Sequence, residues 1–331
     1  MIISRTPFRI SFFGGGTDYP AWYEKNGGAV LSTTIDKYCY ISVRYLPPFF
    51  EHKHRVVYSL IENVKSAGQI KHPAVKALFK LFKINKGLEI HHDGDLPARA
   101  GLGSSSAFTV GMLNCLHALR GKIISKGDLA KKAIDVERNI LKENVGSQDQ
   151  VSVAFGGFNK IVFHNDHNFR LEPVTLIKKR VSQLEGHLML VFTGLSRLAS
   201  VIAAEQIKNM SLRKLELSAM FKMVDEAIGI LNSSCDIKEF GRLLNDSWQL
   251  KKQLSKNISN TTIDNIYGLA LRNGAIGGKL LGAGGGGFIL LFVPPERRKR
   301  LKNALREFLE VKFSFENSGS QIIYYNPQEV V

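Results

Sequence analysis

The stretch Leu96–Gly111, LPARAGLGSSSAFTVG, is the part of the sequence that says most about the fold. Two glycines, Gly101 and Gly103, enclose one leucine, three serines follow, and an apolar run begins at Ala107. Glycines let backbone N–H groups approach an anion without obstruction by a Cβ atom, and the first turn of a helix adds free N–H donors and partial positive charge. The stretch therefore predicts a phosphate-binding loop that leads into a helix starting near Ser104.

A simpler interpretation of this loop is a serine that caps a helix after a glycine turn. One serine would suffice for a cap, so three serines and two glycines favour an anion site. The common G-x-x-x-x-G-K-[ST] phosphate loop is excluded, because no lysine follows Gly103 and Lys279 precedes a leucine. Gly282, Gly284 and Gly287 have G-x-G-x-x-G spacing, but they follow a predicted helix and precede a predicted strand, the reverse of a dinucleotide-binding turn.

The composition is typical of a globular protein. The chain has 331 residues, of which 44% are hydrophobic and 22% charged, and this length predicts two domains or one large α/β domain. No apolar run approaches the ~20 residues that cross a membrane, no signal peptide is recognised, and three distant cysteines form no disulfide framework. We therefore expect a cytoplasmic protein. The net charge of +16 favours anionic ligands, either nucleic acid or phosphorylated small molecules, but no nucleic-acid-binding motif is present.

Predicted strands and helices alternate along the chain, which favours an α/β or α+β fold. A polar, turn-rich stretch lies between residues 165 and 185, so we divide the chain into domains at 1–170 and 171–331. The patterns predict strands over residues 30–46, 87–97 and 288–293, and helices over 107–119, from 125 onward, and over 198–232, 237–255 and 296–308.

The helix predicted from Ser125 places Glu137 near the middle of its apolar face. An α-helix turns by ~100° per residue, and this rotation places the lysines, Asp135 and Arg138 on the opposite face. A carboxylate that faces the interior without a partner is costly, so Glu137 needs a cation. That cation is either a structural arginine or Mg²⁺ near bound phosphates.

A second carboxylate lies in GSQDQ, residues 146–150. Ser147 and Gln150 have the spacing of a capping box, which predicts a helix start with Asp149 in its first turn. Asp149 would then complement the helix dipole, or serve as a base beside an acceptor hydroxyl.

Two charged residues lie in the N-terminal stretch PFRISFFGGGTDY. Arg9 falls in a predicted strand among apolar residues, where an arginine needs a partner. Asp18 follows three glycines and either caps the turn or receives the hydroxyl groups of a sugar. The sequence leaves both interpretations open.

Three motifs, in order and along nearly the whole chain, resemble those of the GHMP family of small-molecule kinases. They are TPFRISFFGGGTD, PARAGLGSSSA and KLLGAGGGGFIL, and the second, similar to P-x-x-x-G-L-G-S-S-A, is the most specific. The resemblance implies a two-domain α+β fold, with an N-terminal ATP-binding α/β domain similar to a ribosomal-protein fold and a C-terminal ferredoxin-like α+β domain. It also implies ATP and Mg²⁺ as cofactors.

The resemblance further assigns roles to individual residues. Asp149 would be the catalytic base, and Arg9 would stabilise that aspartate or the transferring phosphoryl group. Ser105 and Glu137 would hold Mg²⁺. The residues implied in ATP binding are Gly101, Leu102, Gly103, Ser104, Ser105, Ser106 and Ala107. The residues implied in acceptor binding are Gly16, Thr17, Asp18, Gly284, Gly285 and Gly286.

Within the family, RTPFRISFFGGGTDYPAWY and TGLSRLAS are most similar to kinases that phosphorylate the anomeric C1 hydroxyl of D-glycero-D-manno-heptose 7-phosphate to the 1,7-bisphosphate. Galactokinases have G-E-H-T-D where this chain has GGGTD, which argues against ordinary galactokinase activity. Two alternatives stay open: another sugar 1-kinase acting on galactose, fucose or an N-acetylhexosamine, and an RNA-binding protein. We expect a monomer or homodimer that binds a sugar phosphate and ATP, without nucleic acid or membrane partners.

Overall fold

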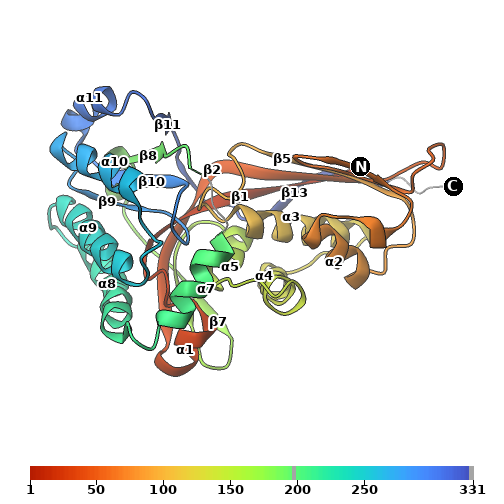
Figure 1. The fold of residues 1–331 in the computed structure, drawn as a ribbon, viewed down its shortest axis with the longest axis horizontal. Coiled ribbons are helices and arrows are strands. Elements are labelled where there is room, and N and C mark those ends of the chain that lie inside the picture. Colours follow the sequence, from red (N-terminus) through yellow and green to blue (C-terminus); the bar gives the residue numbers. More distant parts are fainter. Residues whose placement is uncertain (196–198, 328–331) are drawn as a thin grey trace.

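The computed structural model describes residues 1–195 and 199–327, and these residues form two β-sheets with helices packed against them (Figure 1). The larger sheet has the strand order β13–β1–β2–β5–β3–β4, with β6 and β12 also paired to β2 and β7 paired to β6. Its strands are β1 (Ile2–Phe13), β2 (Gly28–Tyr45), β3 (His54–Val57), β4 (Ile61–Val64), β5 (Leu88–Gly94), β6 (Phe158–Phe163), β7 (Phe169–Pro173), β12 (Phe315–Glu316) and β13 (Gln321–Tyr325).

Helices cover one face of this sheet (Figure 1). They are α2 (Pro73–Leu81), α3 (Ser104–Leu119), α4 (Lys126–Asp135) and α5 (Gln148–Phe155). Helix α3 is apolar nearly all round because it packs between β1 and β2 on one side and α4 and α5 on the other. This central packing fixes the N-terminus of α3, where the phosphate-binding loop ends.

The second sheet lies at the other end of the molecule, at the left of Figure 1, and has the order β11–β8–β10–β9. Its strands are β8 (Leu188–Phe192), β9 (Gly277–Leu280), β10 (Phe288–Phe292) and β11 (Leu309–Val311). The remaining helices are α1 (Pro20–Asn26), α6 (Lys178–His187), α7 (Ala199–Asn209), α8 (Lys214–Asn232), α9 (Lys238–Gln253), α10 (Thr261–Arg272) and α11 (Pro295–Ala304), with a short 3₁₀ turn η1 (Ala67–Gln69). None of the described helices has the length and apolar character needed to cross a membrane.

The chain crosses between the two sheets more than once. Strand β7 spans residue 170, and β12 and β13 return from the second sheet to pair with β2 and β1. The division into domains 1–170 and 171–331 stays a prediction.

Two predicted helices differ from those in the structure. The single helix predicted over residues 198–232 is two helices, α7 and α8, because the chain turns after Asn209, whose side-chain amide donates to the Leu254 carbonyl. The helix predicted from Ser125 begins as expected but changes at Val136 into a π-helical turn, η2 (Val136–Ile140), in which the Leu141 N–H donates to the Val136 carbonyl. Ile140, which a regular helix would bury, is 41% exposed as a result.

Candidate active site

The predicted phosphate-binding loop is built as the sequence indicated. Helix α3 begins at Ser104, and its N-cap is Gly103, with φ of 76°. No side chain caps this end of the helix, so the first N–H groups of α3 are left for another acceptor. Ser104 and Ser105 line the adjoining cavity, which makes a bound anion the natural acceptor for these donors.

Strand β1 holds the loop in place through Arg9. The backbone N–H of Arg9 donates to the Leu102 carbonyl at 3.0 Å, and its Nη1 donates to the Gly101 carbonyl at 2.7 Å. From the second sheet, the Phe288 N–H donates to the Ala100 carbonyl at 3.1 Å. The loop therefore lies where the two sheets meet.

The glycine-rich third motif touches the phosphate-binding loop backbone to backbone. A Cβ atom on Gly282 would lie 2.5 Å from the Gly101 Cα, and one on Gly101 would lie 2.5 Å from the Leu281 carbonyl oxygen. Both glycines also have positive φ, 72° and 82°. Only residues without a side chain let the two loops approach this closely.

We expect Gly282→Ala to separate these loops. The added Cβ overlaps Gly101 and occupies a left-handed conformation, so the KM for ATP should rise at least tenfold and the free energy of unfolding should fall by about 2 kcal/mol. Steady-state kinetics and urea denaturation measure both. The matched control is Gly229→Ala in α8, where no atom lies within 4 Å of the new Cβ and a slight stabilisation is expected. Indistinguishable results for the two variants would contradict the proposed contact.

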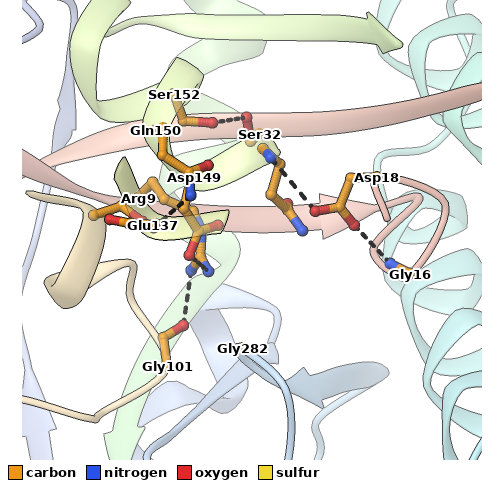
Figure 2. A network of polar contacts seen from close by, with 12 residues as sticks. Arg9, Gly16, Asp18, Ser32, Gly101, Glu137, Asp149, Gln150, Ser152 and Gly282 are labelled. Carbon is orange, nitrogen blue, oxygen red and sulfur yellow. Dashed lines mark hydrogen bonds and ion pairs between the residues drawn. The ribbon is translucent and has the colours of Figure 1, made fainter. Parts of the chain in front are cut away.

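Arg9 and Asp149 form a bidentate ion pair at the edge of the loop (Figure 2). Arg9 Nε donates to Asp149 Oδ1 and Nη2 to Oδ2, each at 2.8 Å. The Arg9 side chain is 4% exposed, whereas that of Asp149 is 25% exposed toward the cavity. The partner that Arg9 requires is thus a carboxylate 140 residues away, and this pairing holds the carboxylate in one orientation.

Asp149 occupies the first turn of α5, as predicted. Ser147 is the N-cap residue, but the predicted capping bond is absent, and its hydroxyl instead lies 3.4 Å from that of Tyr23. Asp149 therefore sits near the positive end of α5 while its side chain reaches Arg9 and the cavity. Both interpretations of this residue, dipole partner and site carboxylate, are compatible with its position.

Asp18 is held by the glycine turn that precedes it (Figure 2). Its Oδ1 accepts from the Gly16 N–H at 2.9 Å, and its Oδ2 from the Gln148 N–H at 3.4 Å. Burial raises the pKa of Asp18, although the Gly16 bond opposes the change and the nearby Asp149 charge adds to it. Asp18 therefore caps its turn and also lines the same cavity as Asp149.

Glu137 is fully buried in the π-helical turn η2, as its predicted apolar face required. Its Oε2 accepts from Ser106 Oγ at 2.9 Å and from Gln150 Nε2, whereas Oε1 has no hydrogen-bond partner. Burial raises the pKa of Glu137 to about 7. Within residues 1–195 and 199–327 no ion pair reaches it, so the structural arginine considered from the sequence is not its partner.

These groups fit a divalent cation beside the phosphate-binding loop. The free Oε1 of Glu137 is a buried carboxylate oxygen without a partner, and Mg²⁺ prefers such oxygen ligands. The serine that contacts Glu137 is Ser106, whereas Ser105 is exposed on the first turn of α3. The Ser105–Glu137 pair predicted as metal ligands stays a prediction, and Ser106 is the hydroxyl that the structure brings to this carboxylate.

One cavity of about 1020 Å³ brings most of the predicted residues together. The predicted site residues that line it are Arg9, Gly16, Asp18, Gly101, Gly103, Ser104, Ser105, Ser106 and Asp149. Leu102 and Ala107 are buried behind the loop. Thr17 instead ties the turn together by donating to the Gly14 and Ala29 carbonyls.

The third motif reaches the cavity through other residues than those predicted. Gly282 and Ala283 line it, whereas Gly284 packs on Ile258 and Gly286 on Leu195. The Gly285 N–H donates to the Ile258 carbonyl. The predicted acceptor contacts of Gly284, Gly285 and Gly286 stay a prediction.

Two buried lysines in the cavity wall were not recognised in the sequence. Lys251 is 5% exposed and Lys279 is 2% exposed, and both line the cavity. The helical projection that located Glu137 would have found Lys251, because Leu244, Ser247 and Trp248 precede it on the buried face of α9. Lys279 lies among apolar residues in β9, the same signal that singled out Arg9.

The uncapped start of α3 and the Arg9–Asp149 pair lie in one cavity, an arrangement expected of an enzyme that transfers phosphoryl groups. Comparison with known proteins makes the class specific. The family model "GHMP kinases N terminal domain" matches residues 69–157, and "GHMP kinases C terminal" matches residues 231–311. A relative that belongs to the kinases is 31% identical over 92% of the chain. The two family models and this relative show that the chain belongs to the GHMP kinase family.

That relative is D-glycero-alpha-D-manno-heptose 7-phosphate kinase of Campylobacter jejuni, 93% of which is covered. A galactokinase of Pyrococcus furiosus is 28% identical, with 95% of each chain covered. Among solved structures, a D-glycero-D-manno-heptose 1-phosphate kinase from Bacteroides thetaiotaomicron has a TM-score of 0.80 at 22% identity, covering 98% of this chain and 99% of the other.

The comparisons confirm the predicted two-domain α+β GHMP kinase fold and the predicted enzyme class, a phosphotransferase. ATP is the phosphoryl donor that this family uses. Family membership favours an enzyme over the RNA-binding alternative. Of the stretch TGLSRLAS, residues 196–198 lie outside the described part of the chain.

Proposed function

We propose that this chain is an ATP-dependent sugar kinase that phosphorylates the anomeric C1 hydroxyl of D-glycero-D-manno-heptose 7-phosphate and releases the 1,7-bisphosphate. The observation that carries the proposal is the Arg9–Asp149 pair, which lies between the phosphate-binding loop and Asp18 in one cavity. The 31% identical heptose 7-phosphate kinase supports the choice of acceptor.

The triphosphate of ATP binds at the start of α3. The free N–H groups of the helix and the hydroxyls of Ser104 and Ser105 face its oxygens. Glu137 and Ser106 would hold Mg²⁺, which neutralises phosphate charge when it is bound. These groups replace the lysine that the loop lacks.

The base end of the nucleotide fits an aromatic part of the same cavity. The rings of His72 and Phe108 stack with centroids 4.7 Å apart, and Tyr58 meets His72 edge-on at 4.8 Å. All three line the cavity, and burial lowers the pKa of His72, which favours its neutral ring. A neutral, flat and apolar surface of this kind suits adenine.

The acceptor sugar binds between Asp18 and Asp149. An Asp18 carboxylate oxygen accepts from sugar hydroxyls, while Asp149 accepts the proton of the reacting hydroxyl. The hydroxyl oxygen then forms a bond to the γ-phosphorus, the bond between that phosphorus and the β–γ bridging oxygen breaks, and ADP leaves. Arg9 holds Asp149 in place through both guanidinium contacts and supplies positive charge.

The test is an acceptor panel with ATP. The acceptors are heptose 7-phosphate, the same heptose without phosphate, galactose, fucose and N-acetylhexosamines, with the site of the new phosphate assigned by ³¹P NMR. We expect a product phosphorylated at C1, with kcat/KM for the heptose 7-phosphate at least 100-fold above that for each neutral sugar. A higher kcat/KM for galactose or fucose would contradict the proposed acceptor. A product phosphorylated elsewhere would contradict the C1 assignment.

A further inference from the structure

Lys251 is a buried cation in the cavity wall that the proposed mechanism does not yet use. It extends from the last turn of α9, and its Nζ donates to the Leu280 carbonyl at 3.2 Å and to the Gly282 carbonyl. An ammonium group has three N–H donors, so one remains after these two bonds. Within residues 1–195 and 199–327 no carboxylate forms an ion pair with Lys251, although its side chain is almost fully buried.

The positive charge of Arg9, by contrast, already has a carboxylate partner within the protein. Its Nε and Nη2 donate to Asp149, and its Nη1 donates to the Gly101 carbonyl. A guanidinium bound bidentately to a carboxylate is neutralised as a pair. A further unpaired cation beside Arg9 would therefore add to the stabilisation of an incoming phosphoryl group.

The position of Lys251 matches the place where that charge is needed. Its acceptor Gly282 packs directly against Gly101 of the phosphate-binding loop, and Arg9 donates to the Gly101 carbonyl. Lys251 from α9 and Arg9 from β1 thus bind the two loops where these loops touch. Lys251 lines the same cavity as Ser104 and Asp149, and it is close enough to Asp149 for their charges to interact.

We propose that Lys251 is a further catalytic residue, whose free N–H contacts the γ-phosphoryl oxygens during transfer. The inference rests on the proposed kinase function and deepens it. No proton moves through Lys251: the acceptor proton goes to Asp149, the new O–P bond forms, the bond to ADP breaks, and the ammonium remains protonated throughout. Its effect is electrostatic stabilisation of charge on the transferring group.

The charges around Lys251 set its protonation. Burial and, to a lesser extent, the charge of Arg9 lower its pKa to about 8, while Asp18 and Asp149 oppose the change. Lys279, whose Nζ donates to the Phe12 carbonyl at 2.7 Å, is the other buried lysine nearby. Lys251 is therefore mostly charged at pH 7 and loses its charge as the pH rises above about 8.

The alternative is that Lys251 only anchors the third motif through two carbonyl bonds. Two substitutions separate these roles. Lys251→Gln keeps N–H donors for the carbonyls but removes the charge, whereas Lys251→Arg keeps the charge. The matched control is Lys252→Gln, the adjacent lysine, which is 30% exposed and pairs with Asp264.

The experiment measures kcat, the KM for ATP and thermal unfolding for all three variants. We expect Lys251→Gln to lower kcat about 100-fold while the KM for ATP changes by no more than about threefold. The kcat of Lys251→Arg should lie within tenfold of the parent value. The kcat of Lys252→Gln should equal that of the parent. The parent kcat/KM for ATP should also decline above about pH 8, and this decline should vanish in Lys251→Gln. Parent-like kcat in Lys251→Gln, or a rise in KM that accounts for the whole loss, overturns the proposal.

A second measurement is independent of the acceptor. Aluminium fluoride with ADP and Mg²⁺ imitates the transferring phosphoryl group, so Lys251→Gln should weaken the fluoride-dependent gain in ADP affinity at least tenfold and leave the affinity for ADP alone unchanged. Equal gains in parent and variant would overturn the role of Lys251. Absence of turnover by the parent on every sugar would instead contradict the proposed acceptor, and the fluoride comparison would still decide the role of Lys251.

Discussion

Asp149→Asn is expected to lower kcat/KM for the acceptor about 1000-fold, the largest effect of any substitution considered. The amide cannot accept the hydroxyl proton, and a positioned base contributes about 10²–10⁴ to the rate. The geometry should survive, because an asparagine oxygen still accepts from Arg9, whose Nε and Nη2 now bind two carboxylate oxygens at 2.8 Å. The loss should therefore fall on kcat and leave the KM for ATP nearly unchanged.

Asp225→Asn is the matched control for this substitution. Asp225 also forms an ion pair, with Lys160, but its side chain is 72% exposed. We therefore expect a far smaller loss of kcat/KM from Asp225→Asn. Steady-state kinetics at saturating ATP, together with thermal unfolding to exclude misfolding, measure the difference. If Asp149→Asn retained kcat/KM within tenfold, which corresponds to about 1.4 kcal/mol, the assignment of the base would be wrong.

Glu137→Gln is expected to change the dependence of activity on Mg²⁺. The amide removes the negative charge of the free Oε1 while keeping the size of the side chain, so the concentration of Mg²⁺ that gives half-maximal activity should rise at least tenfold. A titration of activity with Mg²⁺ at fixed ATP checks this. An unchanged titration would exclude Glu137 as a ligand.

The same substitution should stabilise the metal-free protein. The folded pKa of Glu137, about 7, lies above its ordinary value of 4.5, so the folded protein holds this proton more tightly than the unfolded chain. The stability from this proton is complete below pH 4.5 and is lost as the pH rises through about 7, on the order of 3 kcal/mol in all. Glutamine has no such proton to lose.

Urea denaturation in EDTA at pH 5 and pH 8 measures this effect. The difference in unfolding free energy between Glu137→Gln and the parent should increase from pH 5 to pH 8 in favour of the variant, because other titrating groups are common to both. Ser106 and Gln150 can both still bond to the amide, so folding should be unimpaired. A variant that is less stable than the parent at pH 8 would contradict the buried, unpaired carboxylate.

Local sequence patterns predicted much of the site. Glycines followed by serines gave the loop and the start of α3 at Ser104, and helical periodicity gave the burial of Glu137. The π-helical turn at residues 136–140 was missed because a regular 100° projection contains no signal for it. That turn leaves Ile140 exposed, and π-helical turns of this kind often accompany functional sites.

Patterns failed where a partner lies far along the chain. Ser147 begins α5 as predicted, but its hydroxyl is near Tyr23 instead of the helix N–H groups. Similarly, the sequence did not show which serine contacts Glu137; it is Ser106, since the direction of each serine depends on how α3 packs against η2. A helical projection places Lys251 on the buried face of α9, but its carbonyl partners appear only when α9 meets the glycine-rich loop.

By itself the sequence indicated the family, the glycine turn that begins α3 and the residues whose burial demanded a partner. These follow from backbone freedom at glycine and from the spacing of apolar side chains, which are properties of neighbouring residues. Only the tertiary structure decided which partners meet: Arg9 with Asp149, Glu137 with Ser106, and Lys251 with Gly282. The reason is that these pairs join separate elements, and their distances depend on the packing of two sheets and their helices rather than on spacing along the chain.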